Sequence, residues 1–224
     1  MGNETQKKIA GEEAAKLVKS GMVVGLGTGY TVFYTIQKLG ERVKTEGLDI
    51  IGIPTSVDTE TKARGFGIKL ATIDEYLPEL AIDGADEIDR NKQLIKGGGG
   101  ALTREKVIDY RAKEFVVIAD EGKLVKRLGE KSPLPIEVLP FCWQRLRKEL
   151  EARFGFNKVE LRAKVGKTYI TDNKNYILDC FGRIEEAKAL EQELNQIPGI
   201  VENGLFTIKV KEVIVGTDSG IKRF

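Results

Sequence analysis

The sequence contains no histidine among its 224 residues. This absence excludes Ser-His-Asp and Cys-His catalysis, HExxH zinc sites and any histidine general base. Acid–base chemistry would therefore fall to Asp, Glu, Lys or Tyr side chains. Cysteine is also scarce, since Cys142 and Cys180 lie far apart and form no C-x-x-C pair. We expect neither a disulfide framework nor a cysteine metal site, and we interpret both residues as small, partly buried apolar groups in a reducing compartment.

Long apolar runs and an excess of one charge sign are missing as well. No stretch approaches the roughly 20 apolar residues that span a bilayer, and residues 1–9 hold no apolar signal core. The 36 Lys and Arg residues nearly balance the 34 Asp and Glu residues, and no long basic block occurs. We therefore expect a soluble cytoplasmic protein whose main partner is neither a membrane nor a nucleic acid.

The pattern of predicted strands and helices changes near Pro133 and Pro135. Before this point, short β-branched segments alternate with helical patterns, which predicts an α/β fold with a mostly parallel, doubly wound, Rossmann-like sheet. The expected strands of that sheet are residues 22–26, 49–53, 68–73, 80–82, 94–95 and 115–119. After this point, the order strand-helix-strand-strand-helix-strand is typical of a ferredoxin-like α+β domain.

The last apolar segments again look like buried strands, which we expect to return to the first sheet. The sequence thus predicts a Rossmann-like catalytic domain of residues 1–128 plus 206–224. A smaller ferredoxin-like domain of residues 129–205 is inserted before the C-terminal strands.

Two charged motifs each follow an apolar segment. The acidic turn of residues 83–89 reads DGADEID, and residues 96–106 read KGGGGALTREK. Loops at the carboxyl ends of strands in α/β proteins commonly hold ligands. We therefore expect two adjacent strands to place carboxylates, an ammonium group and the four glycines of residues 97–100 at one edge of the sheet. These groups suit proton transfer on an anionic substrate.

The acidic turn allows two interpretations. Asp83 and Asp86 can bind Mg²⁺ together with a substrate phosphate, or they can cap a turn. Four acids within residues 83–89 exceed what capping needs, and we expect Glu87 and Asp89 to be merely solvated. The motif alone does not decide whether a metal ion binds to Asp83 and Asp86.

The glycine-rich turn of residues 25–29 also allows two interpretations. Gly25, Gly27 and Gly29 fail the G-x-G-x-x-G template because Tyr30 stands at its last position. What remains is either an ordinary turn or an anion site at a helix N-terminus, to which the hydroxyls of Thr28 and Thr31 can add donors.

The run of residues 97–100 is interpreted as an anion nest rather than a linker, and it is not a Walker A loop. Glu105, in the first turn of the next helix, is either a dipole-favoured acid or a general base. Lys123 is either a solvated lysine or a further positive group at the same sheet edge, and Lys7 is a surface helix lysine by default.

Together, residues 27–31, 83–87 and 96–106 and the tail segments 203–206 and 213–216 resemble the type A ribose-5-phosphate isomerase family. The resemblance covers essentially the whole chain. It implies reversible isomerisation of D-ribose 5-phosphate and D-ribulose 5-phosphate in the non-oxidative branch of the pentose phosphate pathway. It implies a small-molecule sugar phosphate as the ligand, no metal or organic cofactor, and a homodimer or homotetramer.

The resemblance also implies residue roles. Glu105 is the general base, Lys96 stabilises the enediolate together with the glycine amides, and Asp83 and Asp86 contact the sugar hydroxyls. The remaining expected substrate-binding residues are Lys7, Thr28, Gly29, Tyr30, Thr31, Gly84, Ala85, Gly97, Gly98, Gly99 and Lys123. The family usually has serine where this chain has Tyr30, so the phosphate is expected to depend on the backbone amides of the turn.

Two other classes of function are alternatives to this one. A sugar-phosphate sensor on a related fold would need an output element, and no basic recognition segment precedes the predicted sheet. An acyl-CoA transfer enzyme would need a nucleophilic glutamate and room for a long cofactor, which the sequence alone does not exclude.

Overall fold

The structure, a computed structural model, describes residues 3–224. The chain forms two compact units. The first unit runs from the first described residue to Ala85 and adds Arg104–Lys123 and Lys209–Phe224. The second unit comprises Asp86–Thr103 and Leu124–Ile208. The sequence places residues 86–103 with the first sheet, whereas the structure groups them with the second unit.

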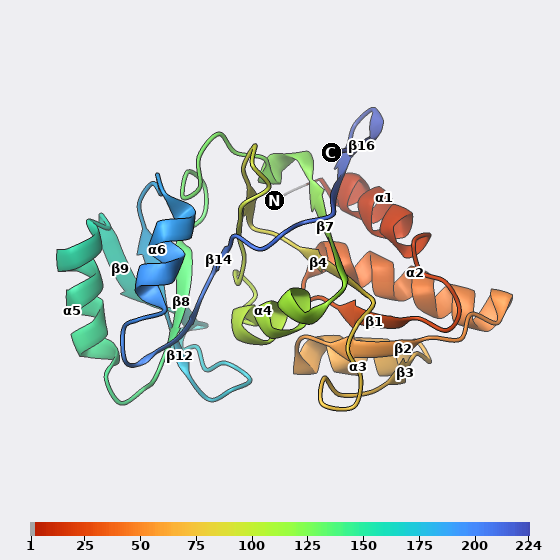
Figure 1. The fold of residues 1–224 in the computed structure, drawn as a ribbon, viewed down its shortest axis with the longest axis horizontal. Helices are drawn as coiled ribbons and strands as arrows, with labels where there is room; N and C mark the ends of the chain where they lie inside the picture. Colours follow the sequence, from red (N-terminus) through yellow and green to blue (C-terminus); the bar gives the residue numbers. More distant parts are fainter. Residues whose placement is uncertain (1–2) are drawn as a thin grey trace. The chain divides into compact units, whose positions relative to one another are not determined.

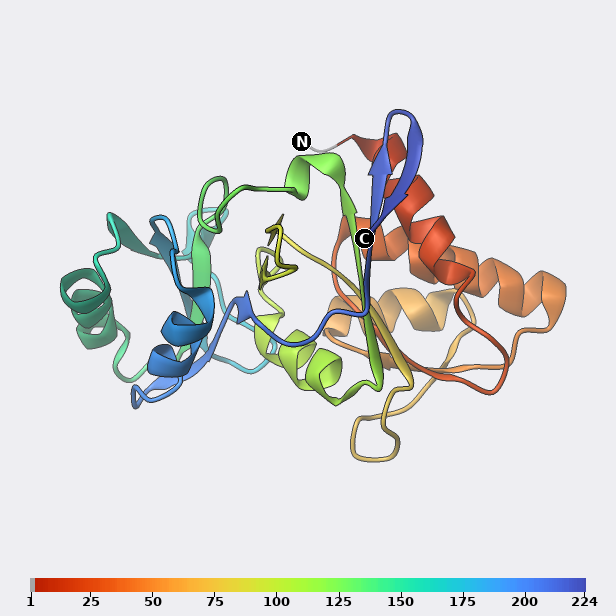
Figure 2. The same cartoon turned by 45° about the horizontal axis from the view of Figure 1, so that its top comes forward.

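The first unit is built on a seven-stranded sheet with the order β16-β15-β7-β4-β1-β2-β3 (Figure 1). Every neighbouring pair in it is parallel except the terminal hairpin of β15 and β16, which is visible in Figure 2. The strands are β1 (Val23–Leu26), β2 (Ile51–Pro54), β3 (Lys69–Leu70), β4 (Leu80–Gly84), β7 (Glu114–Asp120), β15 (Glu212–Thr217) and β16 (Gly220–Arg223). The predicted mostly parallel α/β class is confirmed.

Side chains alternate along each strand, so the sheet has two apolar faces, and helices cover both of them. Val24 and Leu26 of β1 join the core cluster that contains Ile36. Gly25 lies between them and faces the other way, where its missing Cβ leaves room for Ile108. The helices concerned are α1 (Glu4–Ala15), α2 (Tyr30–Glu46), α3 (Val57–Gly65) and α4 (Leu102–Arg111). The helix that carries Ile108, α4, therefore lies on the face opposite to α2.

The second unit contains the antiparallel sheet β13-β8-β12-β9 with two helices. Its elements are β8 (Leu134–Val138), α5 (Trp143–Phe154), β9 (Lys158–Leu161), β12 (Tyr176–Phe181), α6 (Ala187–Leu194) and β13 (Ile200–Asn203). Leu146, Leu150 and Leu194 of the helices pack in one cluster with Ile136 and Leu178 of the sheet. The predicted β-α-β-β-α-β order is thus present.

One strand prediction is wrong. Residues 94–95 form β6 (Leu94–Ile95), which belongs to a separate antiparallel sheet between β5 (Glu87–Ile88) and β14 (Leu205–Phe206). Lys96 therefore does not follow a strand of the parallel sheet. The reason is pairing at long range, since the backbone groups of β6 bond to a segment more than 100 residues away in the chain.

A small hairpin was not expected from the sequence. β10 (Ala163–Lys164) and β11 (Lys167–Thr168) are joined by Val165 and Gly166, whose φ angles are 52° and 71°. Such a two-residue turn with positive φ favours Asn-Gly, and a β-branched residue is strained there. Val165 is also 94% exposed, so its side chain gains little from packing.

Replacing Val165 with asparagine is expected to raise the free energy of unfolding by roughly 1 kcal/mol, because the strain of the left-handed backbone is relieved. Val201→Asn is the matched control, since Val201 lies at an irregularity of β13 but lacks the positive φ of Val165. That control should not stabilise the protein. Denaturant unfolding of both variants measures the difference, and equal effects would contradict the turn argument.

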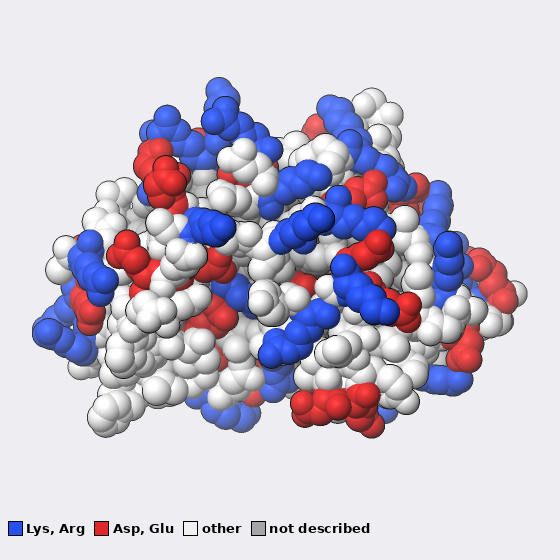
Figure 3. Space-filling view, viewed as in Figure 1, with Lys and Arg blue, Asp and Glu red and all other residues white. Residues whose placement is uncertain are grey.

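Three remaining expectations concern thiols, charge and membranes. Cys142 and Cys180 are both free, and burial raises the pKa of the Cys180 thiol far above its usual range. On the face shown in Figure 3, cationic and anionic side chains are interspersed. Within residues 3–224, no helix combines the length and the apolar character that crossing a membrane requires.

Candidate active site

The turn after β1 presents a helix N-terminus. α2 begins at Tyr30, and Gly29 precedes it with a φ of 125°, capping the helix through its backbone only. The first amides and the helix dipole favour an anion at this place. The Tyr30 side chain is 82% exposed, and the Lys7 Nζ lies 5.6 Å from the centre of its ring. Lys7 therefore adds a positive charge beside the turn.

The Thr28 hydroxyl is engaged inside the first unit. Its Oγ1 lies 2.7 Å from the hydroxyl of Thr55, 2.8 Å from that of Ser56 and 3.1 Å from that of Thr59. Ser56 is also the N-cap of α3, and its Oγ accepts from the Thr59 amide at 3.0 Å. This hydroxyl cluster ties the turn after β1 to the start of α3. Thr31 lies in the first turn of α2, outside this hydroxyl cluster.

Asp83 lies at the carboxyl end of β4 and is fully buried. Its Oδ1 accepts from the Thr28 amide at 3.1 Å and from the Gly84 amide at 2.6 Å. A Cβ at Gly27 would lie 2.0 Å from the same oxygen. Glycine is therefore required at position 27 by the close approach of the Asp83 carboxylate, which joins two of the predicted motifs directly.

Glu105 lies in the first turn of α4 and is only 4% exposed. Lys106 and Asp109 on the same helix are also buried. A buried acid is uncommon on a helix of a soluble protein. Burial therefore sets Glu105 apart from a solvated surface acid.

Lys123 ends the short 3-10 helix η1 (Glu121–Lys123), which follows β7. The buried Gln6 side chain donates to Glu121 Oε1 at 2.6 Å and to Asp218 Oδ1 at 2.8 Å. Gln6 thereby fixes the start of α1, with Lys7, to the turn that carries Lys123. The sequence analysis missed Gln6, because a single glutamine in an amphipathic helix carries no signal.

In the second unit, Asp86 contacts the glycine bed, which we define as residues 97–100. The Gly98 amide donates to Asp86 Oδ2 at 2.6 Å. Lys96, just before the bed, is 2% exposed, and its Nζ lies 5.1 Å from the centre of the Phe206 ring. Gly98 and Gly99 are exposed. The acidic turn and the glycine bed thus meet through Asp86.

Buried polar groups support this region from the sheet of the second unit. Glu137 on β8 is fully buried and accepts from the Thr103 hydroxyl at 2.6 Å. It also accepts from three residues of one loop, Thr171, Asn173 and Asn175, at 2.9–3.2 Å. Sequence reasoning missed Glu137, and only the polar run of residues 171–175 between two strands hinted at a structured turn.

The prediction that Glu87 is merely solvated is wrong. Glu87 is fully buried, and its carboxylate accepts from the amides of Gly129, Lys131 and Ser132 at 2.6, 2.5 and 2.6 Å. Asp89 is half-buried and caps a turn, accepting from the Asn91 and Gln93 amides. These two acids therefore have structural partners and leave Asp83 and Asp86 as the candidates for substrate contact.

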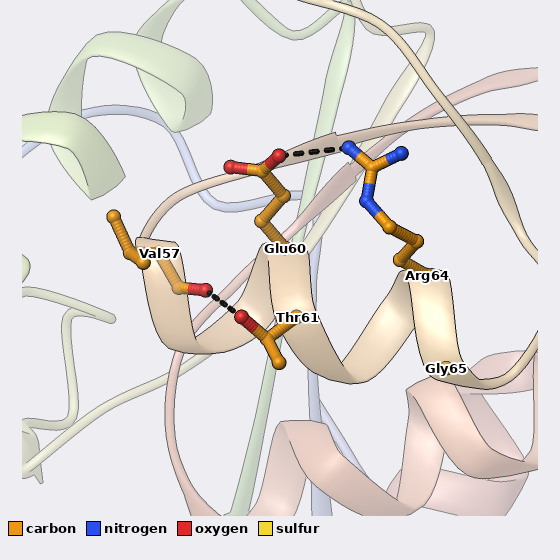
Figure 4. Close-up of a pocket in the computed structure, with 5 residues that line it drawn as sticks. All are labelled: Val57, Glu60, Thr61, Arg64 and Gly65. Carbon is orange, nitrogen blue, oxygen red and sulfur yellow. Dashed lines mark hydrogen bonds and ion pairs between the residues drawn. The ribbon is translucent and has the colours of Figure 1, made fainter.

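Two further observations concern metals and hollows. Within residues 3–224, no group of three or more Asp, Glu, His or Cys side chains could hold a metal ion. A hollow of about 450 Å³ lies over α3, where Glu60 and Arg64 form an ion pair of 2.8 Å (Figure 4). Its lining residues are Val57, Glu60, Thr61, Arg64 and Gly65, and none of them was predicted as a site residue.

The two units divide the predicted site residues between them. The first unit holds Lys7, Thr28, Gly29, Tyr30, Thr31, Asp83, Gly84, Ala85, Glu105 and Lys123. The second unit holds Asp86, Lys96, Gly97, Gly98 and Gly99. The chain passes between the units four times, and the two passages at Ala85–Asp86 and Thr103–Arg104 lie inside the predicted motifs.

Known proteins resemble this chain over its whole length. The family described as ribose 5-phosphate isomerase A (phosphoriboisomerase A) matches residues 51–220. Ribose-5-phosphate isomerase A of Methanocaldococcus jannaschii is 49% identical over 223 residues, covering 99% of this chain and 98% of the relative. The Pyrococcus horikoshii relative of the same name is 48% identical, covering 100% and 99%.

Solved structures agree with the sequence comparison. The structure of ribose 5-phosphate isomerase A from Methanocaldococcus jannaschii superposes with a TM-score of 0.93 at 48% identity, covering 97% of both chains. A D-ribose-5-phosphate isomerase in complex with phospho-erythronic acid gives a TM-score of 0.95 at 47% identity, covering 100% of this chain and 99% of that one. The chain belongs to the ribose 5-phosphate isomerase A family.

Proposed function

We propose that this protein interconverts D-ribose 5-phosphate and D-ribulose 5-phosphate. The observation that carries the proposal is the full-length similarity to isomerases of that name at 48–49% identity. A related isomerase was solved with phospho-erythronic acid, which is a sugar-acid phosphate. The motifs of this chain supply the groups that such chemistry needs, which supports the same conclusion.

The reaction moves one proton between neighbouring carbons. The open-chain aldehyde loses a proton from C2 and gains one at C1, passing through an enediolate. Glu105 carries this proton, in keeping with a buried carboxylate at a helix start. A positioned general base typically accelerates such a step by about two to four orders of magnitude.

The enediolate carries negative charge that must be stabilised. Lys96 and the amides of the glycine bed supply a cation and N–H donors for the developing oxyanion. Removing one donor of this kind typically costs roughly 3–4 kcal/mol of transition-state stabilisation. Asp83 and Asp86 orient the sugar hydroxyls, and one of them assists opening of the furanose ring.

The phosphate binds at the N-terminus of α2. The backbone amides of Gly29 to Thr31, the Thr31 hydroxyl and the nearby Lys7 bind it, and Lys123 adds a further positive charge. Binding energy from this remote group holds C1 and C2 against the base.

Thr31→Ala is expected to weaken binding of ribose 5-phosphate more than Tyr30→Phe does. Loss of a hydrogen bond to a charged group costs roughly 1.5–3 kcal/mol, whereas an unused hydroxyl costs almost nothing. The Michaelis constants of both variants for ribose 5-phosphate and for unphosphorylated ribose measure the effect. A larger loss for Tyr30→Phe on the phosphorylated sugar alone would make the tyrosine hydroxyl the phosphate ligand.

The proposed function is tested by an isomerase assay on ribose 5-phosphate after exhaustive chelation. Full activity is expected, because a lysine and a glycine bed can stabilise the enediolate without a metal. Activity that disappears with the chelator and returns with Mg²⁺ would show that Asp83 and Asp86 are metal ligands. A protein that is folded yet inactive with and without Mg²⁺ would contradict the isomerase function.

The setting of the reaction is also part of the proposal. We infer that the protein works in the cytoplasm, in the non-oxidative branch of the pentose phosphate pathway, as a homodimer or homotetramer. Light scattering of the purified protein measures the assembly, and a monomer at working concentration would contradict it.

A further inference from the structure

Three successive carbonyl groups of the glycine bed accept hydrogen bonds from two side chains of the second unit. Arg162 Nη1 donates to the carbonyl oxygen of Gly97 at 2.7 Å and to that of Gly98 at 3.2 Å. The Tyr169 hydroxyl donates to the carbonyl oxygen of Gly99 at 3.2 Å. A Cβ at Gly100, where φ is 84°, would lie 2.3 Å from the Tyr169 hydroxyl. The bed therefore rests directly on these side chains.

Arg162 is itself held by Asp179 on β12. Its Nε donates to Asp179 Oδ2 at 2.9 Å, and its Nη2 donates to Asp179 Oδ1. The two side chains are only 13% and 14% exposed. A largely buried two-point pair of this kind fixes the plane of the guanidinium, so the N–H groups of Nη1 point in fixed directions.

The direction of each carbonyl determines the direction of the following amide. In a trans peptide the C=O and N–H bonds point opposite ways, so the amides of Gly98, Gly99 and Gly100 point away from the side chains that hold the carbonyls. The Gly98 amide donates to Asp86, and the Gly100 amide donates to the Gly97 carbonyl oxygen at 3.0 Å. The Gly99 amide has no acceptor within residues 3–224, and Gly99 is exposed.

The charge of Arg162 also changes the strength of that donor. Arg162 bonds the Gly98 carbonyl, which belongs to the same peptide group as the Gly99 N–H. A cationic donor on the carbonyl oxygen polarises the peptide and makes its N–H a better donor, since hydrogen bonds in a chain strengthen one another.

We propose that Arg162, anchored by Asp179, is a positioning residue that aims and polarises the Gly99 amide toward the oxyanion of the enediolate. The inference rests on the proposed isomerase function. Arg162 touches the glycine carbonyls and not the substrate. Because the oxyanion develops only in the transition state, the loss of Arg162 should lower kcat more than it changes KM.

The test compares Arg162→Met with the parent protein and with Arg127→Met. Arg127 forms an exposed ion pair with Glu185 in the same unit and is absent from the glycine-bed contacts, so it is the matched control. Arg162→Met is expected to lower kcat by about 10- to 100-fold, below or near the loss of a direct oxyanion donor, and to leave KM nearly unchanged. The control is expected to keep the parent kcat.

Equilibrium binding of two ligands is a second measurement. A purely structural role of Arg162 would not affect the Kd of one ligand and spare that of the other. Phospho-erythronic acid carries a planar carboxylate whose charge resembles that of the enediolate, whereas inorganic phosphate reports on the α2 turn alone. The Kd for phospho-erythronic acid should rise about tenfold in Arg162→Met, the effect of losing one hydrogen bond to a charged group. The Kd for inorganic phosphate should stay at the parent value.

Two further variants decide the matter if Arg162→Met does not fold. Arg162→Lys keeps the charge without the two-point fork, and Asp179→Asn weakens the anchor, so both should show intermediate losses of kcat. Parent values of kcat and of both Kd in folded variants would overturn the inference, as would equal losses of both ligands. Inactivity of the parent protein would instead overturn the proposed function, and the two Kd values would still decide the role of Arg162.

Discussion

Glu105→Gln is expected to lower turnover on ribose 5-phosphate by about two to four orders of magnitude, the usual worth of a general base. The amide has nearly the same shape as the carboxylate but accepts no proton. Substrate affinity should change little, because the phosphate and the sugar hydroxyls are held by other residues. Steady-state kinetics in both directions of the reaction measures the effect.

Glu41→Gln is the matched control for this variant. Glu41 lies on α2 in the same unit, where its carboxylate forms an exposed ion pair of 3.0 Å with Lys38. Its replacement should leave turnover at the parent level, since exposed pairs contribute little. Near-normal turnover in a folded Glu105→Gln protein would mean that another group removes the C2 proton.

The second large effect is expected on stability, from Glu87→Gln. The carboxylate of Glu87 is buried and accepts from three backbone amides of residues 129–132. An amide side chain keeps one oxygen and turns an NH₂ group toward at least one of these donors. Lost charge-assisted bonds and an unsatisfied N–H should together lower the free energy of unfolding by about 2–4 kcal/mol.

Glu130→Gln is the control within the same loop. Glu130 is exposed, and its only recorded hydrogen bond within residues 3–224 is one of 3.3 Å from the Lys126 amide. Its replacement should change stability by less than about 0.5 kcal/mol. Chemical denaturation of the two variants measures the contrast, and a similar small effect at Glu87 would show that the three amides find other partners.

The sequence alone determined the features that depend on local pattern and on residue chemistry. The predicted order strand-helix-strand-strand-helix-strand is present, with its first helix at Trp143–Phe154 and its third strand at Tyr176–Phe181. Ser56 caps α3 through a bond to the amide of Thr59, and a side chain three residues from its partner needs no tertiary contact. The fold class and the family follow from motifs that are short and contiguous. The absence of histidine left carboxylates and lysines for the chemistry.

Tertiary structure alone decided which polar residues are buried and what holds them. Glu87 lies in an acidic turn and looks solvated, yet three amides from more than 40 residues away in the chain surround it. The two-residue strand β6 is too short to reveal that it pairs with β14 rather than with the parallel sheet.

The support of the glycine bed by Arg162 likewise has no signature in the local sequence, because 64 and 65 residues separate Arg162 from the glycines that it bonds. Hydrogen bonds between distant segments form only once the backbone brings donor and acceptor within about 3 Å. The sequence therefore determines the chemistry of each side chain, whereas the tertiary structure determines which groups it contacts.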